Sequence, residues 1–121
     1  MTQSEWTIEY YITDDGAAPV REFLHRLDDK TYARFLWSFE QLRVRNVTAR
    51  EPLVKHLEGK LYELREESQT NIYRIVYFFF TGRRIVLLNG FQKKSQKTPR
   101  SEISMAMIRM KRFLEREGNE R

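Results

Sequence analysis

The chain of 121 residues has no cysteine, only two histidines and only three prolines. Without cysteine it can form neither disulfides nor thiolate zinc sites, and it lacks a thiol nucleophile. The two histidines, His25 and His56, are far apart in the sequence and have no cluster of carboxylates beside them. Neither "TGRR" nor "NGF" has the spacing of a nucleotide-binding glycine loop. We therefore expect no metal and no cofactor.

Long apolar runs are also missing. No stretch is long enough to span a bilayer, and the first residues, "MTQSEWTIEYYI", lack the basic and apolar regions of a signal peptide. We expect no membrane association and a cytoplasmic location. The length suits one domain covering residues 1–121, because no Pro/Gly/Ser-rich linker divides the chain.

Basic charge is abundant and unevenly placed. The 22 lysines and arginines exceed the 17 acids by five. Between positions 83 and 101 there is no acid, and six cations occur: Arg83, Arg84, Lys93, Lys94, Lys97 and Arg100. This segment accounts for the whole excess. It indicates an anionic partner, although a solvated basic loop remains the alternative interpretation.

Hydrophobic periodicity in the first half predicts one strand and two helices. Apolar residues alternate in "EWTIEYYI", as in a half-buried strand. After the turn "TDDG", the stretch "APVREFLHRL" begins with Pro19 at a favourable first helical position. A second helix is expected from about Lys30 to Arg45, with Asp28 or Asp29 as its cap.

The second half changes to a strand period. Three strands are expected in "KLYELREE", "NIYRIVYFFF" and "RRIVLLNGF", with a tight turn at Thr81 and Gly82. A last helix begins near Thr98 and Pro99 and ends at about Gly118. The order predicts an α+β domain: a small, twisted, largely antiparallel sheet of about four strands, with two N-terminal helices and a C-terminal helix.

Two arginines conflict with a simple apolar core. Strand parity places Arg74 on the face of Ile72 and Val76, so its guanidinium needs a carboxylate, a sheet edge or an anionic ligand. Glu63 and Glu66 are the candidate structural partners. Arg65 can reach the same face from the adjacent strand, or be an exposed charge at a strand end. If the strands form a meander, these arginines lie near the lysines that follow Phe91, which predicts a cationic pocket suited to phosphate.

The motifs resemble a known family. The segments "KHLEGKLYELR", "YRIVYFFF" and "IVLLNGFQKKSQKTPRSEISMAMIR" are similar to HigB-type toxins of the RelE/ParE superfamily, in the branch that includes phage-derived toxin-like proteins. The resemblance implies a RelE-like fold and a type II toxin-antitoxin pair. It also implies that this toxin cleaves messenger RNA on the ribosome, and that a cognate antitoxin, often of the helix-turn-helix HigA type, neutralises it.

The resemblance also implies roles for individual residues. Arg65 and Arg74 are expected to hold the scissile phosphate, and Lys93, Lys94 and Lys97 to complete the catalytic site. The expected RNA-binding set is Lys60, Tyr62, Arg83, Arg84 and Arg100. The chain departs from better-known members where Asn89 replaces a common histidine and Ser104 replaces a tyrosine. These changes leave the general acid and base unassigned.

The chemistry expected from the resemblance is attack by the RNA 2′-hydroxyl on the adjacent phosphorus, for which no metal is needed. Arginine suits such a site because its planar fork binds two phosphate oxygens. A lysine whose pKa is lowered by neighbouring cations is one candidate for proton transfer. Two alternatives remain: a ParE-like toxin that poisons DNA gyrase, and a noncatalytic RNA-binding module.

Overall fold

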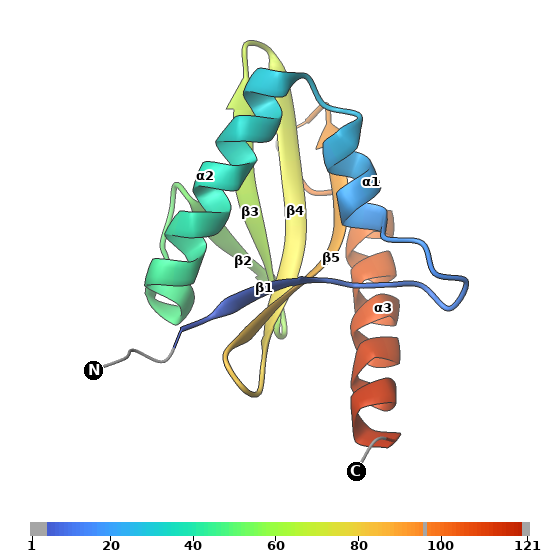
Figure 1. The fold of residues 1–121 in the computed structure, drawn as a ribbon. Coiled ribbons are helices and arrows are strands. Elements are labelled where there is room, and N and C mark those ends of the chain that lie inside the picture. Colours follow the sequence, from blue (N-terminus) through green and yellow to red (C-terminus); the bar gives the residue numbers. More distant parts are fainter. Residues whose placement is uncertain (1–4, 96, 120–121) are drawn as a thin grey trace.

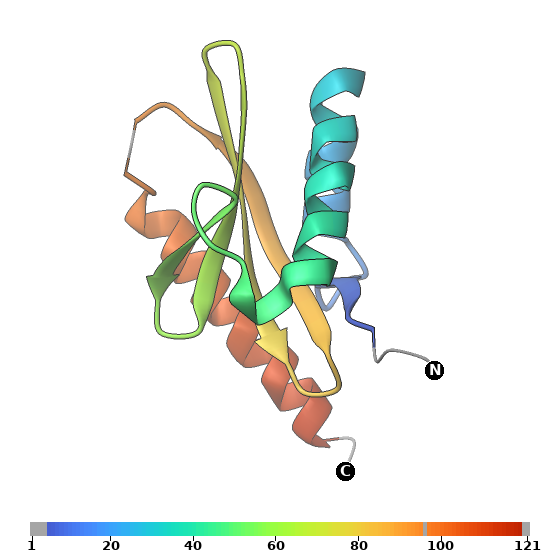
Figure 2. The same cartoon turned by 90° about the vertical axis from the view of Figure 1, so that its left-hand side faces the viewer.

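The protein, described here from a computed structural model covering residues 5–95 and 97–119, has three layers. Two helices lie on one face of a sheet and a third lies on the other (Figures 1 and 2). The elements, in chain order, are β1 (Thr7–Tyr10), α1 (Pro19–His25), α2 (Asp29–Arg45), the 3₁₀ turn η1 (Asn46–Thr48), β2 (Val54–Glu58), β3 (Leu61–Ser68), β4 (Asn71–Phe80), β5 (Arg84–Lys93) and α3 (Arg100–Asn119).

The sheet has five strands in the order β1-β5-β4-β3-β2. Strands β2 to β5 form an antiparallel meander, whereas β1 pairs in parallel with β5. The α+β class and the three helices are therefore confirmed, and the sheet has one strand more than the expected four. The additional strand, β2, is short and forms one edge of the sheet.

Local sequence explains the helix starts and the main hairpin. Pro19 occupies the first turn of α1, and the side chain of Asp28 accepts a hydrogen bond from the Thr31 amide at the start of α2. The loop between β4 and β5 has three residues, Thr81–Arg83, and not two. Gly82 and Arg83 both have positive φ there, at 84° and 59°.

Each face of the sheet has its own core. The face covered by α1 and α2 buries Phe23, Phe35 and Tyr73, together with Ile75 and Leu87. The face covered by α3 buries Leu61, Val76, Phe78, Val86, Leu88, Phe91, Ala106 and Phe113. This division places each residue of β3, β4 and β5 on one of two chemically distinct surfaces.

A β-bulge changes the alternation in β5. The register passes from Val76 opposite Asn89 to Tyr77 opposite Leu87, so one additional β5 residue is inserted. Val86 and Leu88 lie in the core under α3, and so does Phe91 beyond the bulge. The bulge thereby keeps the end of β5, including Lys93, on the α3 face.

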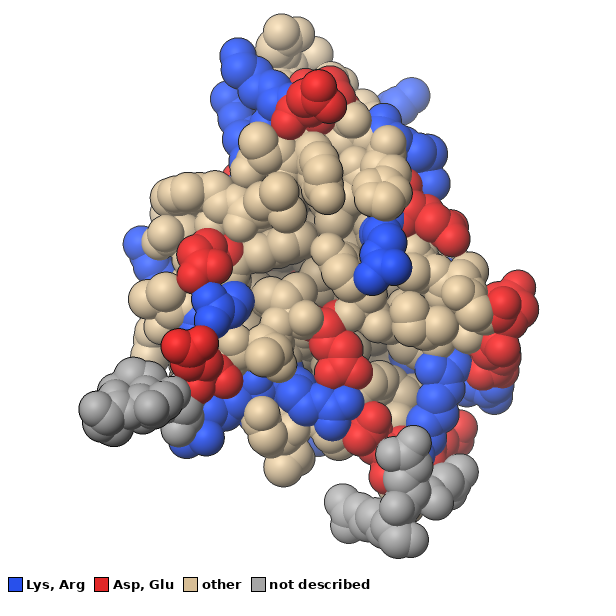
Figure 3. Space-filling model, viewed as in Figure 1, with Lys and Arg blue, Asp and Glu red and all other residues tan. Residues whose placement is uncertain are grey.

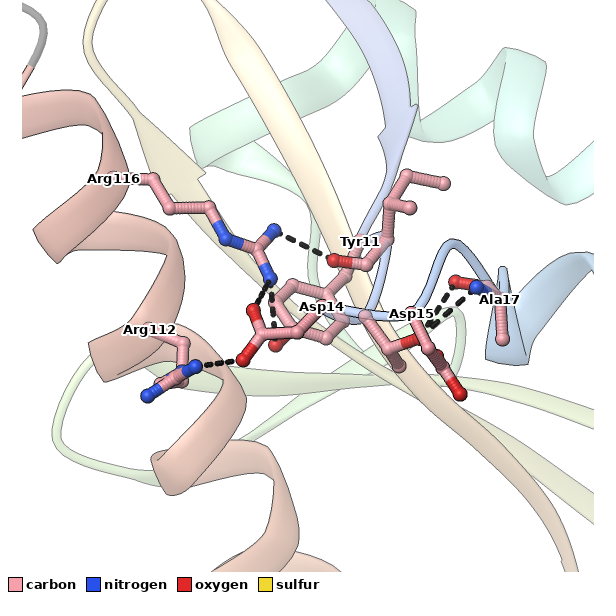
Figure 4. Close-up of polar contacts among 8 residues, drawn as sticks. Tyr11, Asp14, Asp15, Ala17, Arg112 and Arg116 are labelled. Atoms are coloured by element: carbon pink, nitrogen blue, oxygen red, sulfur yellow. Dashed lines mark hydrogen bonds and ion pairs between the residues drawn. The ribbon is translucent and has the colours of Figure 1, made fainter.

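The C-terminal half of α3 is tied to the loop between β1 and α1 (Figure 4). Arg116 donates to Asp14 at 2.7 Å and to the Ile12 carbonyl at 2.6 Å, and Arg112 also donates to Asp14. Arg116 lies 5.0 Å from the centroid of the Tyr11 ring. These contacts fix the helix at the end remote from its first turn.

None of the helices in the described residues combines the length and the apolar character that crossing a membrane requires.

Candidate functional site

Cross-strand pairing brings three of the expected site residues onto the α3 face of the sheet. Arg65 is directly opposite Arg74, and Arg74 is opposite Phe91. Ile72 is opposite Lys93. Directly opposed residues share a face, so Arg65, Arg74 and Lys93 meet at one end of the meander.

Glu63 is the centre of this group. Its carboxylate lies 3.4 Å from Nε of Arg74 and 3.8 Å from Nε of Arg65, and it accepts a hydrogen bond of 2.7 Å from the Thr98 hydroxyl. Lys93 Nζ lies 3.5 Å from the Thr98 oxygen. We call Glu63, Arg65, Arg74, Lys93 and Thr98 the Glu63 cluster. It joins β3, β4 and β5 to the segment that precedes α3.

The cluster has more positive than negative charge. Arg65 and Arg74 both pair with the buried Glu63 carboxylate, Lys93 lies close enough for Glu63 to affect its pKa, and a further carboxylate, Glu51, is exposed and 4.0 Å from Arg65. Nε of both Arg65 and Arg74 is buried without a hydrogen-bond partner in the described residues. Burial is the main cause that lowers the pKa of Arg74. Burial also lowers the pKa of Lys93, and the positive charge of Arg74 lowers it further. Such a site favours an additional anion.

Exposure divides the expected catalytic residues into two groups. Arg74 and Lys93 are 1% and 4% exposed, whereas the Arg65 side chain is 23% exposed. Lys94 and Lys97 are exposed and flank the cluster along the segment after β5. Arg65, Lys94 and Lys97 can therefore contact a large ligand directly, and Arg74 and Lys93 lie behind them.

The structure does not bring Arg83 and Arg84 to the cluster. They lie at the opposite end of β5, where Phe80 pairs with Arg84. Arg84 donates to Glu9 at 2.8 and 3.0 Å and to Glu117 at 3.1 Å, which raises its pKa. Arg83 is exposed in the hairpin loop. The two arginines are thus about 20 Å from Arg74 along the strand.

Tyr62 and Lys60 are also separate from the cluster. Tyr62 lies on the α2 face, where its ring stacks on Tyr77 with centroids 5.8 Å apart. Lys60 is exposed in the turn between β2 and β3. His56 pairs with Tyr62 and its Nε2 lies 2.7 Å from the Gly59 carbonyl oxygen, so it too points away from Arg74.

Arg100 lies at the first turn of α3 and is bound there. It donates two hydrogen bonds to Glu58, of 2.6 and 3.1 Å. The pair connects the start of α3 to β2 at the surface. Arg100 therefore borders the segment with Lys94 and Lys97 without joining the Glu63 cluster.

The sequence did not predict the roles of two members of the Glu63 cluster, Glu63 and Thr98. Glu63 was expected only as one possible partner of Arg74, the other being Glu66, which instead accepts from Ser38 of α2 at 2.7 Å. Strand period alone separates the two glutamates, because only Glu63 is two residues from Arg65. Thr98 was expected at the start of the last helix, but α3 begins at Arg100 and the Thr98 hydroxyl donates to Glu63.

The replacement residue Asn89 has a structural contact of its own. Its amide donates to the Glu102 side chain at 3.0 Å, which joins β5 to the first turn of α3. In the residues that the structure describes, no group of three or more His, Asp or Glu side chains is arranged to hold a metal ion.

The opposite face differs in charge. Figure 3 shows acidic and basic side chains close to one another around the α1 and α2 face, much of whose middle is uncharged. Among the residues coloured there, no basic patch stands apart from acids.

Comparison with known proteins gives three results. The profile of the family described as phage derived protein Gp49-like (DUF891) matches residues 22–111. Two proteins named probable endoribonuclease HigB1, from Mycobacterium tuberculosis strains CDC 1551 / Oshkosh and ATCC 25618 / H37Rv, are each 29% identical over 97 residues, which cover 80% of this chain and 75% of theirs.

Among solved structures, the archaeal RelE-RelB complex from Pyrococcus horikoshii OT3 contains a chain with the same fold. The TM-score is 0.52 at 23% identity, and the match covers 76% of this chain and 98% of that one. The sequence motifs, the family profile and the fold agree. The chain therefore belongs to the Gp49-like family of phage-derived proteins, and its resemblance to HigB-type toxins of the RelE/ParE superfamily is confirmed.

Proposed function

We propose that residues 1–121 form one toxin domain of a type II toxin-antitoxin system and cleave messenger RNA on the ribosome, in the cytoplasm. The observation that carries this proposal is the Glu63 cluster, in which three cations lie around one buried carboxylate, with the exposed Lys94 and Lys97 in the adjoining segment. The names of the HigB1 relatives support the same activity.

The reaction follows from RNA chemistry. The 2′-oxygen forms a bond to the adjacent phosphorus as the bond to the 5′-oxygen of the next nucleotide breaks, leaving a 2′,3′-cyclic phosphate and a 5′-hydroxyl. The 2′-hydroxyl loses a proton and the leaving oxygen gains one. The protein must orient the nucleotide and stabilise the charge on the phosphorane.

Each part of the cluster has a distinct role in this reaction. Arg65 binds two oxygens of the scissile phosphate, and Lys94 and Lys97 bind it from the segment after β5. Glu63 pairs with both arginines and holds Arg65 in place, while Arg74 adds a positive charge behind it. Lys93, whose pKa is lowered, is the candidate for moving a proton.

The test is cleavage of a defined messenger, with and without programmed ribosomes, with mapping of the new 5′ ends and the 3′ phosphate. We expect ribosome-dependent cuts that leave cyclic phosphate. Arg65→Ala should reduce the rate by at least 100-fold, comparable to loss of one oxyanion-stabilising group. Lys111→Ala removes an exposed cation of α3 outside the cluster and is the matched control.

The lysines sharpen this test. Lys94→Ala and Lys97→Ala should each lower cleavage, and unchanged cleavage in both would contradict their assignment. Growth arrest without cleavage, together with filamentation and DNA-damage signalling, would contradict the ribonuclease and support the gyrase-poisoning alternative.

The partner of such a toxin is an antitoxin, here proposed to be of the helix-turn-helix HigA type. The related archaeal RelE was solved as a complex with RelB, which supports an antitoxin partner. Co-expression with the product of the adjacent gene should yield a stable complex and suppress growth arrest. Free toxin after co-purification would contradict this part.

A further inference from the structure

A pocket opens beside the Glu63 cluster and shares only Arg65 with it. It has a volume of about 610 Å³ and is formed by α2, the segment before β2, and β3. Its lining residues are Trp37, Gln41, Arg45, Pro52, Leu53, Arg65, Glu66 and Glu67. We call it the α2–β3 pocket. Its volume is within the range of about 300–1,000 Å³ that is typical of small-molecule sites.

Strand pairing explains why the pocket is open. The register of β2 with β3 ends at Val54 opposite Leu64, so β3 has no paired strand on this side beyond that point. The Arg65 amide donates to the Leu53 carbonyl at 3.0 Å, which holds the preceding segment beside this edge. The Ser38–Glu66 hydrogen bond fixes α2 on the other side. The pocket is therefore built from anchored elements.

Arg65 connects the pocket to the Glu63 cluster. It lines the pocket, and its Nε lies 3.8 Å from Glu63, the residue that also contacts Arg74. A phosphate bound by Arg65 would thus have the pocket next to it. In an RNA ligand, the group next to that phosphate that could enter the pocket is the base of an adjoining nucleotide.

The lining suits a neutral heterocycle. Trp37 is 60% exposed and presents an aromatic surface, on which a base can stack. Two arginines and two glutamates around the pocket balance in charge, so it is not a second phosphate site. Guanidinium groups donate to ring nitrogens and carbonyls, and carboxylates accept from exocyclic amino groups.

We propose that the α2–β3 pocket is a nucleobase subsite in which a base next to the scissile phosphate stacks on Trp37. The inference rests on the proposed ribonuclease function for its ligand class. A protein segment is the less favoured occupant, because covering the pocket with apolar side chains would desolvate four charged groups.

The experiment is a titration of the full chain with the four nucleoside 5′-monophosphates, followed by tryptophan fluorescence and by calorimetry. Ribose 5-phosphate, which lacks a base, is the matched probe. The chain has two tryptophans, and Trp6 packs edge-on against Phe79. We expect saturable quenching by at least one nucleotide and none by ribose 5-phosphate.

Variants locate the binding. Trp37→Ala should weaken nucleotide binding by about 5- to 150-fold, as expected for one stacked base, and Trp37→Phe should largely retain affinity but lose the quenching. Trp6→Phe should keep both. Val44→Ala changes an exposed apolar residue of α2 outside the pocket and should bind as the wild type does.

Three results would overturn the proposal: no saturable quenching by any nucleotide, quenching that persists in Trp37→Phe, or antitoxin binding lost in Trp37→Ala while nucleotide affinity is unchanged. The titration does not depend on cleavage. A protein that binds nucleotides at Trp37 but cuts no messenger would refute the ribonuclease alone, and one that cuts without a response from Trp37 would refute the pocket alone.

Discussion

Arg74 and Arg84 lie toward opposite ends of the β4–β5 hairpin and differ in how completely carboxylates neutralise them. Arg84 donates four hydrogen bonds to Glu9 and Glu117 and lies 5.0 Å from the centroid of the Phe80 ring. Arg74 shares the single carboxylate of Glu63 with Arg65, at 3.4 Å and 3.8 Å. Arg74 also donates to the Tyr73 carbonyl at 2.8 Å, but its buried Nε has no hydrogen-bond partner in the described residues, whereas Arg84 has two carboxylates to itself.

This difference separates a structural cation from a functional one better than sequence position does. Both arginines occur in strands and both were expected to serve RNA. Arg74 has a buried Nε without a hydrogen-bond partner in the described residues, and the exposed Lys94 and Lys97 lie in the segment after β5 at the same end of the sheet. Such a place favours a bound anion. The site is identified by how fully nearby carboxylates neutralise each arginine, and not by how many basic residues lie close together in the sequence.

Removing Arg74 should have the largest effect on stability. Arg74→Met leaves Glu63 buried without its closest cation and should lower the free energy of unfolding by about 3–5 kcal/mol, measured by urea denaturation. The double variant Glu63→Gln/Arg74→Met should recover most of this loss while remaining inactive. Equal stability of the single variant and wild type would show that the pair is not coupled.

Gly90 tests the packing behind the functional end of β5. A methyl group added there would overlap the ring of Phe23 and lie 2.8 Å from its Cγ. Gly90→Ala should therefore cost about 1–3 kcal/mol of stability. Gly118→Ala in α3 is the control, since nothing lies within 4 Å of the added carbon, and it should be neutral or stabilising. A neutral Gly90→Ala would contradict this packing.

Arg84→Ala should have a smaller effect than Arg74→Met. Glu9 and Glu117 remain partly exposed to water after the change, so the loss should be about 1–2 kcal/mol and should decrease with added salt. Cleavage by the folded fraction should fall far less than in Arg65→Ala. If Arg84→Ala lowered the cleavage rate as much as Arg65→Ala does, the conclusion that only the Arg74 end of β5 is functional would be wrong.

The smallest expected effect is a pH dependence from Lys93. Its pKa is lowered in the folded state, mainly by burial and then by Arg74, so the unfolded chain binds more protons just below the usual lysine pKa. Stability from this group therefore rises as pH rises toward about 10.5. Lys93→Met should remove that slope. Stability is measured by urea denaturation at several pH values for the wild type and for Lys93→Met. Tyrosine titration contributes equally to both proteins and cancels in the difference. Identical slopes of stability against pH would contradict the lowered pKa of Lys93.

Much of the fold was predictable because its strands and helices have clear periods. The alternation in β3 and β4 indicated that Arg65 and Arg74 share a face, and their pairing shows this. The strand β2 was missed because "VKHLE" has only a weak alternation and is an edge. The parallel pairing of β1 with β5 joins residues distant in sequence, which no local pattern reveals.

The site was harder to predict than the fold. Arg83 and Arg84 were expected to act with the lysines because they lie in the same acid-free stretch of sequence, although the length of β5 separates them in space. Tyr62 was expected to bind RNA with the cluster, yet strand parity places it on the α2 face. Trp37 was not expected in any site, because its exposure depends on where α2 crosses the sheet edge.

The most direct test of the account is amide chemical-shift mapping on the 14.7 kDa chain with a short messenger analogue that carries a 2′-deoxy nucleotide at the scissile position and cannot be cut. The account predicts that the largest shifts occur at Arg65, Lys94 and Lys97, with little change at Arg83 and Arg84. Largest shifts at the Arg84 end, or none at the Glu63 cluster, would contradict it.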